Sequence, residues 1–183
     1  YKMKLFAKLK GGHAVFASLA VATLFSFATS TVYAGAGKEW TVSRGDAAGT
    51  GYSTLDQINT GNVSNLKVAW MHSMGSVLSQ ETAPLIIDGV LYASTSSGPA
   101  YVFALDGVTG DTIWSHQPDM PDDYHSIVCC GEANRGVAYS NGRIFFGRLD
   151  AILVALDAKT GEELWQTEVK PYADGYSITV PPL

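Results

Sequence analysis

A repeat with a period of 51 residues constrains the fold of this 183-residue chain more than any other feature. Residues 101–114 (YVFALDGVTGDTIW) align without gaps with residues 152–165 (ILVALDAKTGEELW). Each copy has an apolar run, an Asp-x-x-Thr-Gly turn and a second run that carries a tryptophan. Glycine permits the left-handed turn position, and Asp and Thr side chains hydrogen-bond the turn backbone. Each copy therefore predicts a β-hairpin.

The segments before each hairpin repeat as well. Residues 84–93 (PLIIDGVLYA) match residues 137–146 (VAYSNGRIFF), with an Asp-Gly or Asn-Gly turn between apolar runs. Four strands recurring at this spacing are typical of β-propeller blades, so we predict an all-β propeller with four-stranded antiparallel blades. A weaker earlier copy ends at Trp70, and another blade is expected to open at residues 177–180. We interpret Trp70, Trp114 and Trp165 as packing residues between blades rather than as a ligand cage.

The two ends of the chain predict its domain organisation. Lysines at positions 4, 8 and 10, an apolar run over 14–28 and Val32-Tyr33-Ala34 are typical of a secretory signal over residues 1–34. The apolar run is shorter than the roughly 20 residues of a membrane span. Residues 35–183 hold about three blades, whereas closed propellers need four to eight. We therefore expect the truncated amino-terminal part of a longer propeller.

The charge of the chain argues against nucleic acid as a partner. Net charge is −5 for the whole chain. Four lysines and none of the acidic residues lie in the predicted signal, so residues 35–183 keep 8 basic and 17 acidic residues, a net charge of −9. Such an acidic surface suits a basic soluble protein partner.

The only cysteines, Cys129 and Cys130, are neighbours in the sequence. Adjacent Cα atoms lie about 3.8 Å apart, below the ~4.4 Å lower end of ordinary disulfides, so a bond between them is strained. Strain of this kind usually marks a functional site. The alternative is a pair of reduced, buried thiols that pack as small apolar side chains. Export to an oxidising compartment favours the disulfide.

Taken together, these motifs resemble the start of the pyrroloquinoline quinone (PQQ) dependent alcohol dehydrogenases, the methanol and ethanol dehydrogenase family of quinoproteins. The resemblance covers essentially all of residues 35–183. Its motifs are residues 43–50 (SRGDAAGT) with Tyr52-Ser53, residues 81–85 (ETAPL), the stretch from Cys129-Cys130 to Asn134-Arg135-Gly136, both hairpins, and Ser177-Ile178-Thr179. The hairpin motif alone is moderately specific, whereas its combination with Cys-Cys and Asn-Arg-Gly is strongly so.

The resemblance implies an eight-bladed propeller with PQQ near its axis. It implies a disulfide between Cys129 and Cys130 against one face of the flat cofactor. It further implies cofactor contacts from Glu81, Arg135 and Thr179, because a guanidinium and a hydroxyl suit a ligand with three carboxylates and quinone oxygens.

Each of these residues also has a simpler interpretation. Without the resemblance, Glu81 is a solvated carboxylate, Arg135 caps carbonyls or pairs with Glu132, and Thr179 is an ordinary strand residue. His72, His116 and His125 show no metal-ligand spacing and stay unassigned.

The function implied by the resemblance is periplasmic oxidation of a primary alcohol to the aldehyde, with electrons passed to a cytochrome c. The family's calcium or lanthanide ligands and its catalytic Asp base lie downstream of residue 183. No catalytic residue or metal ligand is therefore named in this chain, and we expect it to be inactive alone. A homodimer or a small accessory subunit is a possible assembly, and no integral membrane segment is expected after signal removal.

Two other classes compete with this interpretation. A non-enzymatic exported propeller of the outer-membrane assembly type shares the hairpin repeats, but is not expected to carry Cys-Cys before Asn-Arg-Gly. The membrane-bound sugar dehydrogenase branch of the quinoproteins has several amino-terminal membrane spans and lacks the cysteine pair.

Overall fold

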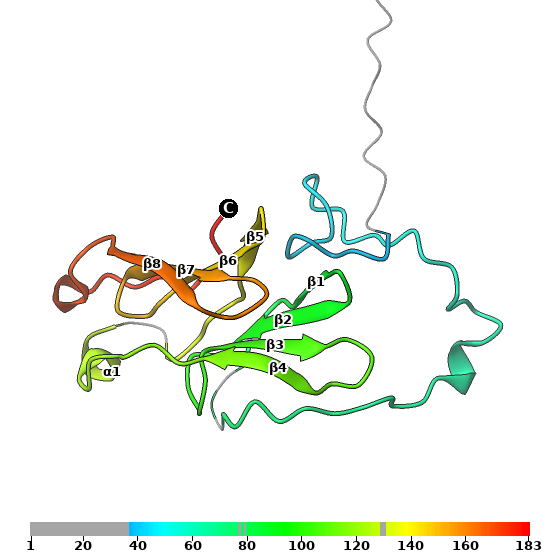
Figure 1. Ribbon diagram of the computed structural model, residues 1–183, viewed down its shortest axis with the longest axis horizontal. Coiled ribbons are helices and arrows are strands. Elements are labelled where there is room, and N and C mark those ends of the chain that lie inside the picture. The colour runs from blue at the N-terminus through cyan, green and yellow to red at the C-terminus, as the bar shows by residue number, and fades with distance from the viewer. Residues whose placement is uncertain (1–36, 77, 79, 129–130) are drawn as a thin grey trace, which may run out of the picture. The chain divides into compact units, whose positions relative to one another are not determined.

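The computed structural model describes residues 37–76, 78, 80–128 and 131–183, and in this part the regular secondary structure consists mainly of β-strands (Figure 1). The strands form two four-stranded antiparallel sheets with the orders β1-β2-β3-β4 and β5-β6-β7-β8. The first sheet comprises β1 (Leu85–Ile87), β2 (Val90–Ser94), β3 (Val102–Asp106) and β4 (Thr112–His116). The second comprises β5 (Ala138–Ser140), β6 (Arg143–Gly147), β7 (Ile152–Asp157) and β8 (Glu163–Glu168). The predicted all-β propeller blades are confirmed.

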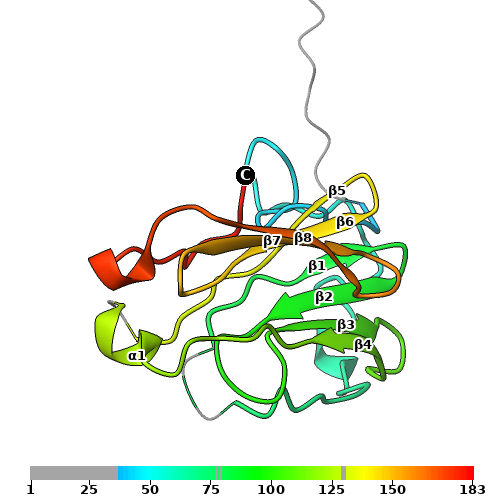
Figure 2. The same ribbon diagram turned by 60° about the vertical axis from the view of Figure 1, so that its left-hand side comes forward.

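Short helical segments connect or flank the sheets. They are η1 (Val63–Asn65), α1 (Tyr124–Ile127) and η2 (Tyr172–Asp174). The hydroxyl of Tyr172 donates to Asp123 at 2.8 Å, which holds η2 beside α1 (Figures 1 and 2). Among the described residues, no helix is long and apolar enough to cross a membrane. The predicted signal segment lies outside the described residues.

Both Asp-x-x-Thr-Gly turns form as predicted, because their hydrogen bonds are local. Asp106 Oδ1 accepts the backbone N–H groups of Val108 and Thr109, each at 2.8 Å. Asp157 Oδ1 accepts the equivalent pair one repeat later, at 2.9 and 3.0 Å. These N–H donors hold the pKa of both carboxyls below the ordinary value. Gly110 and Gly161 close the turns at φ of 77° and 74°.

The shorter turns within each sheet are also repeated. Asp88-Gly89 and Asn141-Gly142 all have positive φ, between 49° and 78°. Two successive positive φ values are the geometry of a type I′ hairpin, whose twist matches that of the flanking strands. The Asp-Gly and Asn-Gly pairs therefore set the register of β1 on β2 and of β5 on β6.

The core lies between the two sheets. Tyr101, which precedes β3, and Phe146 of β6 are fully buried and pack with ring centroids 5.5 Å apart. Aliphatic side chains surround them, and burying each contributes roughly 1.5–3 kcal/mol. These residues are Leu85, Val102, Val137, Ile144, Val154 and Leu156.

The tryptophans pack on the turns of the following hairpin. Trp114 Nε1–H donates to the carbonyl of Ala158 at 3.0 Å, and the indole lies over Gly161, where an added Cβ would come within 2.6 Å of the ring. Trp70 packs in the same way one repeat earlier, on the turn that ends at Gly110. The predicted packing between blades is confirmed for Trp114, which joins β4 to the second sheet, whereas Trp70 packs on the first sheet from a segment that forms no strand among the described residues. Trp165 is 42% exposed and contacts Phe145 of its own sheet.

The two outer segments expected to belong to further blades form no strand in the described part of the chain. Residues 66–70 have no partner strand there, and neither do residues 177–180. A strand is stabilised by ladder hydrogen bonds to a neighbour, so an apolar pattern without a partner remains extended coil. Residues 178 and 179 nevertheless form backbone hydrogen bonds with Arg148, which follows β6, and with Arg135, which precedes β5.

Candidate functional site

Three residues predicted from the sequence meet at one place. Arg135 lies just before β5, Glu81 lies just before β1, and Thr179 lies in the extended segment after η2. The backbone N–H of Arg135 donates to the carbonyl of Thr179 at 3.1 Å, and the carbonyl of Arg135 accepts the N–H of Ala83 at 3.0 Å. The backbone of Arg135 therefore bridges two segments that are distant in sequence.

The side chain of Arg135 makes the same connections. Its Nη2 lies 3.0 Å from Glu81 Oε2, and its Nη1 donates to the carbonyl oxygen of Thr179 at 3.4 Å. The two charged side chains are 43% and 45% exposed, so the ion pair itself contributes about 0–1 kcal/mol. Thr179 contributes its carbonyl to these contacts, whereas its hydroxyl was the expected group.

Of the two simpler interpretations of Arg135, the contact with a carbonyl is present, at Thr179, whereas the pairing with Glu132 is wrong in this structure. Glu132 pairs with His125 instead, and Arg135 pairs with Glu81. Glu81 is half-exposed but not a free carboxylate.

Gly136 allows the close approach that places Arg135. It forms a parallel bridge with Ala83 and has a φ of 131°. A Cβ at this position would lie 3.0 Å from the carbonyl oxygen of Ala83. Backbone conformations with positive φ favour glycine, so the Gly of the Asn-Arg-Gly motif holds the two segments together.

Three buried or half-buried polar residues lie behind the ion pair and were not predicted as site residues. Asn134 accepts a hydrogen bond from the hydroxyl of Ser94 at 2.6 Å, and Ser94 N–H donates to Thr82 Oγ1 at 3.1 Å. Asn134 and Ser94 are almost completely buried. Only their positions in the sequence could have indicated that these residues support the site. Thr82 and Asn134 adjoin predicted site residues, and Ser94 ends an apolar strand.

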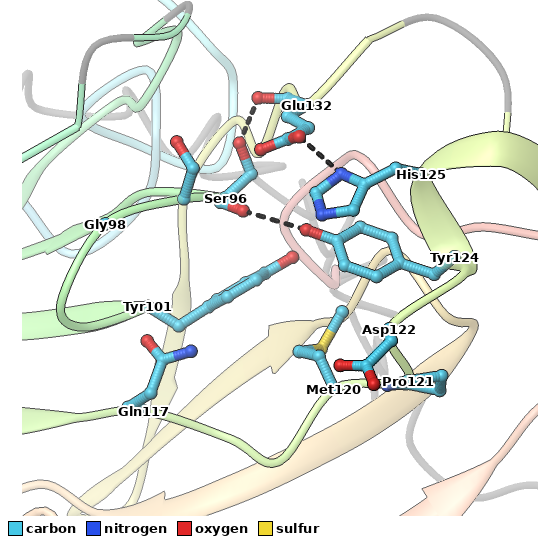
Figure 3. A pocket seen from close by; sticks show the side chains of 11 residues that line it. Ser96, Gly98, Tyr101, Gln117, Met120, Pro121, Asp122, Tyr124, His125 and Glu132 are labelled. Atoms are coloured by element: carbon cyan, nitrogen blue, oxygen red, sulfur yellow. Dashed lines mark hydrogen bonds and ion pairs between the residues drawn. The ribbon is translucent and has the colours of Figure 1, made fainter.

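A cavity of about 300 Å³ lies beside α1 (Figure 3). His125 pairs with Glu132 at its rim, Ser96 Oγ donates to the carbonyl of Glu132, and the hydroxyl of Tyr124 donates to the carbonyl of Ser96 at 3.4 Å. Burial raises the pKa of Tyr124 to about 12, so this hydroxyl stays protonated at neutral pH. Cys129 and Cys130, which follow α1 in the chain, lie outside the described residues.

Within the described ranges, no three His, Cys, Asp or Glu side chains gather closely enough to hold a metal ion. His72 approaches the carbonyl of Gly110 at 3.1 Å, and His116 lies 3.8 Å from Glu163. Both histidines therefore contact the hairpins rather than the Glu81–Arg135 pair.

Comparison with known proteins identifies the family. Residues 40–167 match the PQQ family described as the glucose/ethanol/alcohol dehydrogenase β-propeller domain. The chain is 46% identical over 120 residues to the dehydrogenase subunit of the quinone alcohol dehydrogenase of Gluconacetobacter polyoxogenes, covering 66% of this chain and 16% of that protein. It is 38% identical over 148 residues to the 1-butanol dehydrogenase (cytochrome c) of Thauera butanivorans, covering 78% and 21%.

A solved structure shares the fold. A europium-containing methanol dehydrogenase superposes with a TM-score of 0.73 at 38% identity, covering 79% of this chain and 25% of that chain. The chain thus spans about a quarter or less of the length of these relatives. The match over most of the sequence, the repeated four-stranded sheets and the similarity to alcohol dehydrogenases agree, and the chain belongs to the PQQ-dependent dehydrogenase β-propeller family.

Proposed function

We propose that this chain is the amino-terminal part of a periplasmic quinoprotein that oxidises a primary alcohol to the aldehyde and passes the electrons to a cytochrome c. The observation that carries the proposal is the meeting of Glu81, Arg135 and Thr179 from three separate segments in a chain of the PQQ family. The relative named as a cytochrome c-linked butanol dehydrogenase supports the choice of substrate class and electron acceptor.

The residues present fit PQQ by their chemistry. An arginine carries five N–H donors in a planar fork that matches a carboxylate. In the described part of the chain, Glu81 and the carbonyl of Thr179 each take one contact with the Arg135 guanidinium, and the Arg135 side chain is 43% exposed. Its other N–H groups are open to a carboxylate of the cofactor, and charge-assisted bonds of this kind are strong.

The chain's own part in the reaction is to bind and orient. When bound, PQQ supplies the two-electron acceptor for the alcohol. Glu81 pairs with the guanidinium of Arg135, and Arg135 holds a carboxylate of the ligand. A disulfide between Cys129 and Cys130 would cover one face of the planar ring, and a calcium or lanthanide ion would be held by ligands beyond residue 183. The europium in the solved relative supports the metal requirement.

The experiment uses the longer reading frame that contains this chain, expressed with its signal. Cell fractionation tests the periplasmic location. The purified protein, loaded with PQQ and calcium or a lanthanide, is assayed for alcohol-dependent dye reduction. We expect turnover that requires PQQ. Arg135→Ala should weaken PQQ binding at least about tenfold, because it removes a charge-assisted contact.

Matched variants separate the site from general damage. Arg143→Ala removes an exposed arginine of β6 and should leave PQQ binding unchanged. Cys129→Ser/Cys130→Ser should lower turnover if the disulfide covers the cofactor. A folded protein that neither binds PQQ nor reduces dye would overturn the proposal and favour an exported binding propeller.

A further inference from the structure

The Glu81–Arg135 ion pair is one link of a closed ring of contacts. The other links are two hydrogen bonds and two chain connections through residues behind the pair. Glu81 is covalently followed by Thr82, whose Oγ1 accepts the N–H of Ser94 at 3.1 Å. The hydroxyl of Ser94 donates to Asn134 Oδ1 at 2.6 Å, and Asn134 is covalently followed by Arg135. The 3.0 Å ion pair between Arg135 and Glu81 closes the ring.

Asn134 is the residue that ties this ring to both sheets. Its Oδ1 also accepts the N–H of Gly136 at 3.1 Å, and its Nδ2 donates to the carbonyl of Gly147 at 2.8 Å. Ser94 ends β2 of the first sheet, and Gly147 ends β6 of the second. The side chain is 2% exposed, so these bonds have no competition from bulk water.

The chemistry of the position requires an amide. Two donors, the Ser94 hydroxyl and the Gly136 N–H, point at one end of the side chain, and a carbonyl acceptor lies at the other. A carboxylate has no donor for Gly147, and an aliphatic side chain leaves all three groups unsatisfied. Breaking a buried network of this kind costs more than losing a solvent-exposed ion pair.

The exposed ion pair by itself is therefore too weak to hold this segment, and the buried hydrogen bonds of Asn134 fix the backbone from which the Arg135 side chain extends toward Glu81. We propose that Asn134 is a positioning residue of the cofactor site: it acts through Arg135, which it holds at the correct distance from Glu81 to receive a carboxylate of PQQ. This inference rests on the proposed function and adds Asn134 and Ser94 to the residues on which cofactor affinity depends.

The test measures PQQ affinity by titration of the longer apoprotein, together with thermal unfolding. Asn134→Ala should raise the Kd for PQQ about tenfold, and Ser94→Ala should raise it by a smaller factor in the same direction. The controls are the exposed residues Ser140 and Asn65. Ser140→Ala and Asn65→Ala should leave the Kd within about twofold of wild type.

A double-mutant cycle separates positioning from general stability. If Asn134 acts through Arg135, adding Asn134→Ala to Arg135→Ala should change the Kd by less than about twofold, while it still lowers the melting temperature. If Asn134→Ala does not fold, Ser94→Ala enters the same cycle and decides the question.

Two results overturn the inference, and they are distinguishable. PQQ binding that depends on Arg135 but is unaffected by Asn134→Ala, or a full additive effect of the two substitutions, refutes the positioning role alone. A wild-type protein that binds no PQQ refutes the proposed function and the inference with it.

Discussion

Trp114 and Trp165 occupy the same position in two hairpins of the repeat, yet their surroundings differ. Trp114 is 9% exposed and donates to the carbonyl of Ala158 in the next sheet, whereas Trp165 is 42% exposed. Strand β8 is exposed along its whole length, while β4 buries its tryptophan. The repeated motif places a tryptophan at the same position in each hairpin. That tryptophan is buried only where the turn of the next hairpin packs against it, as the turn at Gly161 does for Trp114.

The largest expected effect tests this contrast directly. In the 183-residue chain, Trp114→Ala should lower the free energy of unfolding by about 3–5 kcal/mol, because it removes a buried aromatic from between two sheets. Trp165→Ala should cost less than about 1 kcal/mol at its half-exposed position. Urea denaturation followed by circular dichroism measures both. Equal losses in the two variants would refute the difference in packing.

Substitutions of two glycines near the Trp114 indole, Gly161 and Gly142, should have intermediate effects on the free energy of unfolding. Gly161 and Gly142 have nearly the same φ, 74° and 75°, but a Cβ at Gly161 meets Trp114 at 2.6 Å, whereas none of the surrounding atoms lies within 4 Å at Gly142. Gly142→Ala should cost about 1–2 kcal/mol from backbone strain alone. Gly161→Ala should cost about 2–4 kcal/mol, because strain and a clash with the indole add.

Both variants are compared by the shift of the urea midpoint at constant slope. Removing the indole tests the cause: in a Trp114→Ala background, Gly161→Ala should cost no more than Gly142→Ala. A persistent difference between the two would mean that the indole is not the reason for glycine at 161.

A smaller effect is expected from Tyr92, whose hydroxyl donates to the same carbonyl of Ala158 at 3.0 Å. Tyr92→Phe should lower the free energy of unfolding by about 1 kcal/mol, because one buried hydrogen bond is lost while Trp114 still satisfies the carbonyl. The exposed Tyr176 provides the control. Tyr176→Phe should leave the unfolding free energy unchanged, and an equal loss there would contradict this account.

The smallest effect is on pH dependence at His116. Burial lowers the pKa of His116 from its ordinary value of 6.5, although Glu163 opposes the shift. The unfolded chain therefore binds the proton more readily, so this contribution to stability is complete above pH 6.5 and is lost as the pH falls toward the folded value. His116→Gln should flatten the fall in melting temperature between about pH 7 and pH 5. The control is Gln117→Ala at the exposed residue that follows His116, and it should keep the wild-type dependence of melting temperature on pH. The same dependence in wild type, His116→Gln and Gln117→Ala would disprove the role of His116.

Much of the local structure was predictable. The Asp-x-x-Thr-Gly and Asn-Gly turns formed where the sequence placed them, because each depends on hydrogen bonds and φ values within five residues. Glu81, Arg135 and Thr179 were named by family resemblance, and the structure brings them together. Their detailed contacts are less predictable: nearness in sequence favours Glu132 as a partner of Arg135, whereas the observed partner, Glu81, lies 54 positions earlier.

The sequence by itself determined the period, the hairpins, their turns and the membership of the family, since these follow from local periodicity and motif spacing. Only the tertiary structure decided which tryptophan is buried and which polar residues support the site. Ser94 and Asn134 are 40 residues apart, and neither carries a local signal for pairing. Their hydrogen bond exists because the packing of two sheets brings the ends of β2 and β6 to one buried point, where every polar group needs a partner.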